Sequence, residues 1–405
     1  MLNSLVNASW VDEERLKVYP LILVGMLAAA TAYVLTGNDG LLPNGNPFGS
    51  DFVSFWVAAR EALVADPTVA YARETFEPIQ QALFPEGGFF AFFYPPHFQL
   101  MLLPLGGLSF FVALIIWLAV TFALVAWVMV KITGNAKLAL LLAIAFPAAF
   151  LNISHGQNAF LTAGLFATGL YLLPSRPVLA GVFFGVLTFK PQLGVLIPVA
   201  LLAAGQWRTI FSAAITTLTL VATSALVLGV DVWSAFLAQT QAATDVLEHG
   251  SVGFAKMISV YSGLRAFDWA HGVSMTAHVL ITLGVVYVIW RVWRPNSGVS
   301  HGLRCALIMS GALIVTPFGL NYDLYLLAPA AAFFVSVVAW QEMDGIERNS
   351  LIAGFFLPLT VLLTMTEGYS LAPWIVLLVF ASFARRALGR TIIPVSEGNR
   401  AVPAQ

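Results

Sequence analysis

A carboxylate follows the first long apolar segment of this sequence. Asp51 lies in GSDFVSFWVAAR (residues 49–60), where small residues precede it and aromatic residues follow. A carboxylate beside a bilayer is costly unless it is hydrated, paired or functional. Asp51 is therefore a candidate general base that would take a proton from an acceptor hydroxyl. The alternative is a helix cap, because Ser-Asp before an apolar run is also a helix-start signal.

Two basic residues lie in apolar surroundings and are candidates for binding a donor phosphate. Lys190 stands between Phe189 and Pro191, and Arg265 ends the segment YSGLR (261–265). Cations in such places could stabilise the charge that develops on a leaving phosphate. Two alternatives stay open. Lys190 could reach the interface or pair with a carboxylate, and Arg265 could anchor the chain to anionic lipid.

Amides and a second carboxylate gather near the same predicted membrane face and could bind an acceptor or a sugar. Gln157 and Asn158 could instead satisfy backbone groups at a helix end, and Asp323 could cap a following helix. No spacing of His, Cys, Asp or Glu matches a metal site, so no cofactor is predicted and any metal requirement is left open. The acceptor-binding and sugar-binding candidates are Gln157, Asn158, Gln192, Asn321 and Asp323.

The elements that must position these residues are membrane helices. The chain has 405 residues, of which 59% are hydrophobic and 10% charged, and its mean hydropathy is +0.86. A soluble domain is about 45–50% apolar and about 25% charged, so this chain needs a lipid bilayer around it. A net charge of -1 argues against nucleic acid as a partner. Cys305 is the only cysteine, which excludes an intrachain disulfide.

Twelve apolar segments are predicted as membrane helices, each to be compared with the length of about 20 residues that a straight span needs. The pair 178–189 and 191–204 is short by that measure and could form a re-entrant hairpin or two short helices. The predicted segments are 18–36, 109–131, 138–154, 158–173, 178–189, 191–204, 208–229, 273–290, 303–318, 324–341, 351–366 and 370–388.

The distribution of basic residues predicts the orientation. With both termini in the cytoplasm, most Lys and Arg residues fall inside, as the positive-inside rule expects. Only five lie outside or at membrane depth: Arg60, Arg73, Lys190, Lys256 and Arg265. Residues 1–390 are then one transmembrane domain, and 391–405 form a cytoplasmic tail.

Two long segments, 37–108 and 231–272, are predicted on the outer face. Residues 52–65 and 232–247 have the pattern of amphipathic helices that lie on the membrane. Residues 89–107 are apolar but interrupted by prolines and glycines. They are predicted as a juxtamembrane or re-entrant segment, with a proline-kinked span as the alternative.

Five segments together resemble glycosyltransferase family 87, from about residue 15 to about residue 390. They are GSDFVSFWVAAR (49–60), FFYPPHFQLMLLPL (92–105), HGQNAFLTAGL (155–165), GVFFGVLTFKPQLGVLIPVALL (181–202) and NYDLYLLAP (321–329). The resemblance implies a GT-C-type membrane fold, a polyprenyl-phosphate sugar donor, inverting transfer on the non-cytoplasmic face and Asp51 as the catalytic base. The mannosyltransferases of this family carry a His near the turn that here is Asn321-Tyr322-Asp323. The resemblance therefore leaves the sugar and the acceptor open.

The sequence thus favours an all-α polytopic membrane protein of about twelve transmembrane helices, with juxtamembrane helices on its outer face. Its predicted activity is transfer of a hexose, mannose by the resemblance, from a polyprenyl-phosphate donor to a glycolipid or glycan acceptor. The predicted location is the bacterial inner membrane, with the active site on the periplasmic face. A polytopic transporter or flippase of lipid-linked sugars, and a non-catalytic subunit of polysaccharide assembly, are the alternatives.

Overall fold

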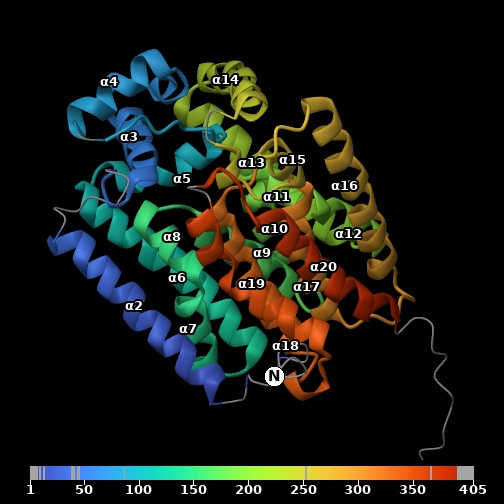
Figure 1. Ribbon diagram of the computed structural model, residues 1–405. Helices are drawn as coiled ribbons and strands as arrows, with labels where there is room; N and C mark the ends of the chain where they lie inside the picture. Colours follow the sequence, from blue (N-terminus) through green and yellow to red (C-terminus); the bar gives the residue numbers. More distant parts are fainter. Residues whose placement is uncertain are drawn as a thin grey trace, which may run out of the picture.

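Six helices in the described part of the chain are long and apolar enough to cross a membrane, which confirms the predicted all-helical, polytopic class. In this computed structural model a further candidate is the pair α7 (Ala136–Ala145) and α8 (Pro147–His155), bent by 62°. The structure describes residues 14–37, 46–85, 87–250, 253–364 and 367–389, with 8, 11 and 42; the predicted tail 391–405 lies outside them. The six helices are α2 (Arg15–Gly37), α6 (Phe110–Thr133), α13 (Trp207–Leu228), α16 (His271–Trp293), α19 (Gly345–Thr364) and α20 (Ala372–Gly389) (Figure 1).

The predicted count of twelve spans is not confirmed, because several apolar segments form shorter helices. These are α9 (Ala159–Leu172), α10 (Pro177–Val186), α11 (Pro191–Gly194), α12 (Leu196–Ala203), α17 (His301–Val315) and α18 (Leu327–Val335). Nearly every side chain of α9 and α17 is buried by other helices. The predicted span 324–341 differs most, because α18 has only nine residues and the chain then turns into η5 (Trp340–Glu342). An apolar sequence predicts burial, but it does not distinguish burial in protein from burial in lipid.

The two segments predicted on the outer face gather at one end of the molecule (Figure 1). The first contains α3 (Ser50–Val64), η1 (Pro67–Tyr71), α4 (Arg73–Leu83) and α5 (Pro96–Gly106); the second contains α14 (Asp231–His249), η3 (Phe254–Lys256) and α15 (Val260–Arg265). They touch through the rings of Tyr71 and Phe236, whose centroids are 5.9 Å apart. Helix α5 has 11 residues, about 16 Å of rise, which is roughly half of a bilayer core.

Helix α3 is not the surface helix that the pattern of residues 52–65 predicts. Its first half is buried on every side, from Phe52 to Ala59. The close partner is α5, where a Cβ on Gly106 would lie 2.6 Å from the carbonyl carbon of Ala59. A glycine at residue 106 therefore lets α5 approach the backbone of α3. The aromatic residues that suggest a membrane surface instead pack inside the protein.

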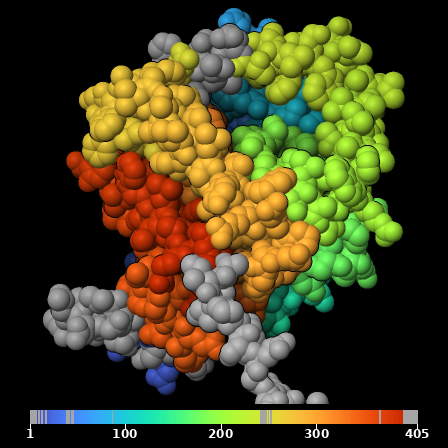
Figure 2. Space-filling view, turned by 90° about the vertical axis from the view of Figure 1, so that its right-hand side faces the viewer, coloured from blue at the N-terminus to red at the C-terminus, as the bar shows by residue number. Residues whose placement is uncertain are grey.

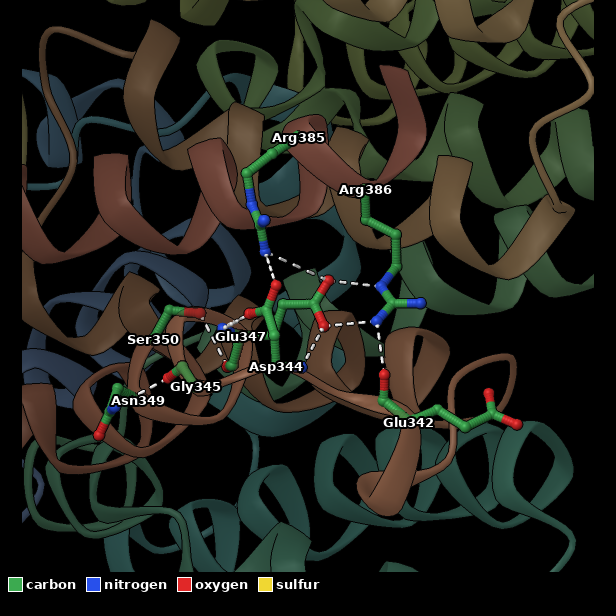
Figure 3. Close-up of polar contacts among 8 residues, drawn as sticks. All are labelled: Glu342, Asp344, Gly345, Glu347, Asn349, Ser350, Arg385 and Arg386. Atoms are coloured by element: carbon green, nitrogen blue, oxygen red, sulfur yellow. Dashed lines mark hydrogen bonds and ion pairs between the residues drawn. The ribbon is translucent and has the colours of Figure 1, made fainter. Parts of the chain in front are cut away.

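The hairpin of α19 and α20 is closed by a cluster of charges at the start of α19 (Figure 3). Asp344 and Glu347 form a capping box: the Asp344 carboxylate accepts from the Glu347 N–H at 3.0 Å, and the Glu347 carboxylate accepts from the Asp344 N–H at 3.1 Å. From the last turns of α20, Arg385 pairs with Asp344, and Arg386 pairs with both oxygens of Glu347. We call these four residues the hairpin clasp.

Candidate functional site

Asp51 directs its carboxylate away from its own helix. The residue that caps α3 is Gly49, which makes no side-chain hydrogen bond, and Asp51 stands in the first turn. Its Oδ2 accepts a hydrogen bond of 2.8 Å from Nε2 of Gln157, in the turn between α8 and α9. Asp51 keeps part of its surface exposed. The carboxylate is thus held by one amide in a place that a substrate could reach, and the capping alternative does not describe it.

Two glycines allow these distant turns to meet. Gly49 and Gly156 both have positive φ, 80° and 68°. A Cβ on Gly156 would lie 2.5 Å from Cβ of Phe52, so only glycine fits against the start of α3. The Gly49 N–H donates to the Ser154 carbonyl at 2.7 Å, and the indole of Trp117 donates to the Gly156 carbonyl at 3.1 Å. These backbone contacts therefore fix the position of Asp51 relative to the turn between α8 and α9.

Lys190 lies in the break between η2 (Leu187–Phe189) and α11 and is 3% exposed. Its Nζ donates to Oδ1 of Asp323 at 2.5 Å and to Oδ1 of Asn158 at 3.2 Å. The same Nζ lies 4.9 Å from the centre of the Tyr322 ring. The pairing alternative is therefore the observed geometry. An ammonium has three N–H donors, so one stays unassigned among the described residues.

Asp323 serves two partners from the short helix η4 (Asn321–Leu326). One oxygen pairs with Lys190, and the other accepts the Leu320 N–H at 3.1 Å, which stabilises the start of η4. Asp323 is 1% exposed. The site thus holds two carboxylates against one ammonium, because Asp51 has an amide as its partner and Asp323 has the cation.

Tyr94 belongs to the site but was not predicted from the sequence. Its hydroxyl lies close enough to the charges of Asp323 and Asp51 and to the side chains of Asn158 and Gln157 for all four to affect its pKa. Burial raises the pKa of Tyr94, and the two carboxylates act in the same direction, so the phenol stays protonated. In the sequence, Tyr94 is one aromatic residue in the proline-rich stretch 89–107, which suggests an interfacial residue. Only the fold brings its hydroxyl within electrostatic reach of both carboxylates.

A packed aromatic group holds the Tyr94 ring. Its ring centroid lies 5.2 Å from that of Phe55 on α3 and 4.8 Å from that of Phe98 on α5. The buried Nδ2 of Asn158 has no hydrogen-bond partner of good geometry in the described chain. An unused buried donor next to fixed oxygens is unusual in a packed interior, and it is available to a substrate hydroxyl.

Three predicted site residues form no side-chain hydrogen bond or ion pair with this cluster in the part of the chain that is described. Gln192 and Asn321 are half-buried and form no side-chain hydrogen bond there. Arg265 lies on α15 and donates to the Trp269 carbonyl at 2.8 Å. It is half-exposed, not enclosed by apolar residues as its sequence suggests. No group of three or more His, Cys, Asp or Glu within the described ranges could hold a metal ion.

The surface of the molecule is hollowed on one side. Figure 2 shows a hollow between the gold segment of α15 and α16 and the yellow-green segment of α13 and α14, with blue-green residues at its floor. A separate cavity of about 420 Å³ runs between α10, α12 and α13 and is lined mainly by apolar side chains. Thr188 and Pro191 line it, and both are within two residues of Lys190.

The sequence model of one protein family, glycosyltransferase family 87, matches residues 92–317, which is more than half of the chain. No curated protein and no solved structure matches the chain. The matched range includes Tyr94, Gln157, Asn158 and Lys190. Asp51 and Asp323 lie outside it, so the evidence that they belong to the same site is the set of hydrogen bonds described above.

Proposed function

The chain belongs to glycosyltransferase family 87, and on that premise we propose that it transfers a hexose such as mannose from a polyprenyl-phosphate donor to a glycolipid or glycan acceptor. The observation that carries the proposal is the hydrogen bond between Asp51 and Gln157. It joins a carboxylate outside the matched range to the polar turn inside it. A family membership supplies the reaction class, and this contact supplies a base for it.

In the proposed reaction Asp51 is the general base, and the configuration at the anomeric carbon of the sugar is inverted. An acceptor hydroxyl attacks the anomeric carbon while its proton passes to Asp51. The bond between that carbon and the phosphate oxygen breaks, and its electron pair leaves with the lipid phosphate. Asp51 is suited to this role because Gln157 fixes one oxygen and the other has no partner in the described chain.

The remaining polar residues are proposed to bind the substrates. Lys190 has one N–H donor available for a phosphate or sugar oxygen, and Arg265 is a second cation for the donor phosphate. Positive charge there would stabilise the phosphate as its negative charge grows. The residues proposed to contact acceptor or sugar hydroxyls are Gln157, Asn158, Gln192, Asn321 and Asp323.

A lipid-linked donor also needs an apolar path beside the reacting centre. The 420 Å³ cavity between α10, α12 and α13 has the right character, because its lining is apolar and it begins next to Lys190. We place the first isoprene units of the donor there. The corresponding location is the bacterial inner membrane, with the polar cluster on the periplasmic face, where both outer segments gather.

An assay with purified protein in detergent tests the proposal. The protein is mixed with a panel of polyprenyl-phosphate hexoses and membrane glycolipid extract, and release of free polyprenyl phosphate is measured. Release from one donor of the panel, dependent on the acceptor, is the expected result. If instead the donor crosses liposome membranes intact, with no release, the protein is a transporter and the proposal is wrong.

A further inference from the structure

A second polar cavity lies at the end of the molecule where the two outer segments gather. Its volume is about 380 Å³, and it lies between η3, α15 and the residues before α20. Lys256, Arg265 and Asp268 supply its charged groups. None of the residues that line it in the described chain belongs to the polar site around Asp51 and Lys190, which we call the Asp51 cluster. A ligand held in this second cavity, the outer cavity, is therefore not in contact with Asp51.

The outer cavity lies at the depth where two membrane helices begin. Helices α16 and α20 are both long and apolar enough to cross a bilayer. Asp268 lies three residues before His271, the first residue of α16, and Gly368 lies four residues before Ala372, the first residue of α20. The hydrocarbon core of a bilayer gives way to lipid headgroups where its spanning helices end. The cavity is therefore at the level of the headgroups.

Exposed aromatic side chains flank the cavity at the same level. Phe267, Trp269, Tyr369 and Trp374, from the residues around the starts of α16 and α20, are 36–54% exposed. The rings of Phe267 and Tyr369 stack with their centroids 6.3 Å apart. Trp and Tyr are enriched at the membrane–water interface, because their rings combine an apolar body with a polar group. These residues independently indicate that the cavity opens beside lipid headgroups.

The Arg265 guanidinium is held in one position within the cavity wall. Nη1 donates to the Trp269 carbonyl at 2.8 Å, and Nη2 donates to the Glu248 carbonyl at 3.4 Å. The group lies 5.0 Å from the centre of the Phe254 ring. Its Nε is buried and has no hydrogen-bond partner among the described residues. A fixed guanidinium with an unused N–H is prepared to bind an oxyanion at low entropic cost.

Lys256 is the second cation of the cavity. Its side chain is exposed and forms no ion pair or side-chain hydrogen bond with any described residue. This contrasts with Lys190, whose charge is met by the buried Asp323. A cation without a carboxylate partner can interact with a ligand at its full charge, whereas a paired one cannot.

We infer that the outer cavity binds the headgroup of an anionic phospholipid of the surrounding membrane, with Lys256 and Arg265 as ligands of its phosphodiester group. Lys256 and Arg265 against Asp268 leave one positive charge on the lining residues. Phosphatidylglycerol matches this charge with one negative charge, and Asp268 can accept a hydrogen bond from its glycerol hydroxyls. In phosphatidylcholine the same phosphodiester is accompanied by a positive group, which the two cations repel.

This inference concerns the membrane and does not depend on the proposed transfer reaction. It selects the second of the two roles that the sequence leaves open for Arg265, an anchor to anionic lipid. Arg265 thereby receives a ligand other than the donor phosphate proposed for it above, and the following experiment decides between the two.

The test compares phosphatidylglycerol and phosphatidylcholine with identical acyl chains, bound to the full-length protein in detergent and detected by native mass spectrometry. Wild type is expected to bind phosphatidylglycerol at least about tenfold more tightly. Lys256→Met and Arg265→Met should each lose about tenfold of that preference, about 1.4 kcal/mol. Lys256→Arg keeps the charge and should retain the preference. Arg73→Met, which removes an exposed cation of the first outer segment, is the matched control and should bind as wild type does.

Four results would overturn the inference. If both Met variants keep the preference while folded, as judged by thermal unfolding, the outer cavity is not the lipid site. Equal binding of the two lipids by wild type would show that the charge of the headgroup is not recognised. If inorganic phosphate displaces phosphatidylglycerol at equal concentration, the cavity is a site for free phosphate. If farnesyl phosphate, a short analogue of the donor lipid, displaces it at equal concentration, the donor contact proposed for Arg265 is the correct assignment. None of these results bears on transfer at Asp51, which the release of polyprenyl phosphate tests separately.

Discussion

The hairpin clasp and the Asp51 cluster are both groups of charged residues in an apolar protein, but they differ in how completely their charges are met. In the clasp, two carboxylates face two arginines, and the box of hydrogen bonds between Asp344 and Glu347 uses the remaining backbone groups. In the cluster, Lys190 pairs with Asp323, and Asp51 has no cation as a partner among the described residues. Asp51 accepts from one neutral donor, Gln157, and Nδ2 of Asn158 has no acceptor there.

This difference separates structural from functional polarity. A buried charge destabilises the fold unless partners satisfy it, so a cluster that serves only stability should be fully paired. The clasp is fully paired. The Asp51 cluster keeps an open carboxylate oxygen, an unused amide donor and a spare ammonium N–H. We interpret these open groups as positions for substrate atoms, and the following variants test that contrast.

The largest effect is expected from Asp51→Asn. Asn keeps the size and can still pair with Gln157, but it cannot accept a proton, so turnover should fall by at least about 10²-fold. Stability should change little, because Asp51 is partly exposed. The measurement is release of polyprenyl phosphate per folded protein. Asp66→Asn, in the same outer segment, is the control and should keep full activity. A rate above about a tenth of wild type in Asp51→Asn would show that this carboxylate is not the base.

The next effect concerns Lys190→Met, which leaves Asp323 buried without its cation. Removing one member of a buried pair costs about 3–5 kcal/mol, so the variant should unfold at much lower denaturant concentration. The double variant Lys190→Met with Asp323→Asn removes both charges, while the Asn oxygen can still accept the Leu320 N–H. It should recover most of the stability.

The double variant also separates the two roles of Lys190. If the spare N–H contacts the donor, the double variant should bind farnesyl phosphate about tenfold more weakly than wild type although it is folded. Equal binding would leave Lys190 as the partner of Asp323 alone. A double variant no more stable than Lys190→Met would contradict the ion pair as the source of the loss.

The sequence alone identifies most residues of the site but not the contacts between them. Polar residues are rare in this chain, and this made five of them candidates: Asp51, Gln157, Asn158, Lys190 and Asp323. Their pairing was not predictable, because it joins residues more than 100 positions apart, such as Asp51 with Gln157 and Lys190 with Asp323. Tyr94 was not predicted because it lies in an apolar, aromatic stretch of the sequence, where a single tyrosine does not stand out as a polar residue.

For the fold, the limits of the long membrane helices were predictable, but what surrounds each apolar segment was not. Long apolar segments such as α6 and α16 lie close to their predicted limits, because length and hydropathy are local properties. The predictions for the segment 324–341 and for helix α3 were wrong about what covers their apolar side chains. The sequence pattern is the same whether lipid or protein covers such side chains. Arg265 was expected in an apolar setting for the same reason, and the structure places it in a polar cavity.

A smaller effect is expected from Glu347→Gln in the clasp. Glu347 is 1% exposed and meets the Arg386 guanidinium with both oxygens. Replacing a charged acceptor by a neutral one should lower the free energy of unfolding by about 2 kcal/mol. Turnover per folded molecule should stay unchanged, because the clasp is distant from the cluster. Glu342→Gln is the control, since Arg386 donates to the backbone carbonyl of Glu342, which this substitution keeps. If the folded Glu347→Gln variant loses turnover, the clasp is not purely structural, and the distinction between the clasp and the Asp51 cluster fails.

The smallest effect concerns Asp344, the exposed member of the clasp. Burial alone would raise the pKa of Asp344, but its hydrogen bonds with Arg385 and with the Glu347 N–H hold that pKa below its usual range. A carboxyl whose pKa is lower in the folded state stabilises the fold above the unfolded pKa, about 3.9, and loses that contribution as the pH falls through the folded value. Its side chain is 48% exposed, so the contribution should be under about 1 kcal/mol.

The measurement for Asp344 is the free energy of unfolding of wild type and Asp344→Asn between pH 2 and pH 7. Asn keeps the acceptor oxygen for the Glu347 N–H, so the difference reports the charge alone. At pH 7 wild type should be slightly more stable, and the difference should shrink as the pH falls below the unfolded pKa, about 3.9, because Asp344 then becomes protonated and neutral like Asn. A difference that does not change with pH would assign the effect to packing or to the hydrogen bond, and it would remove the charge of Asp344 from the balance that distinguishes the clasp from the Asp51 cluster.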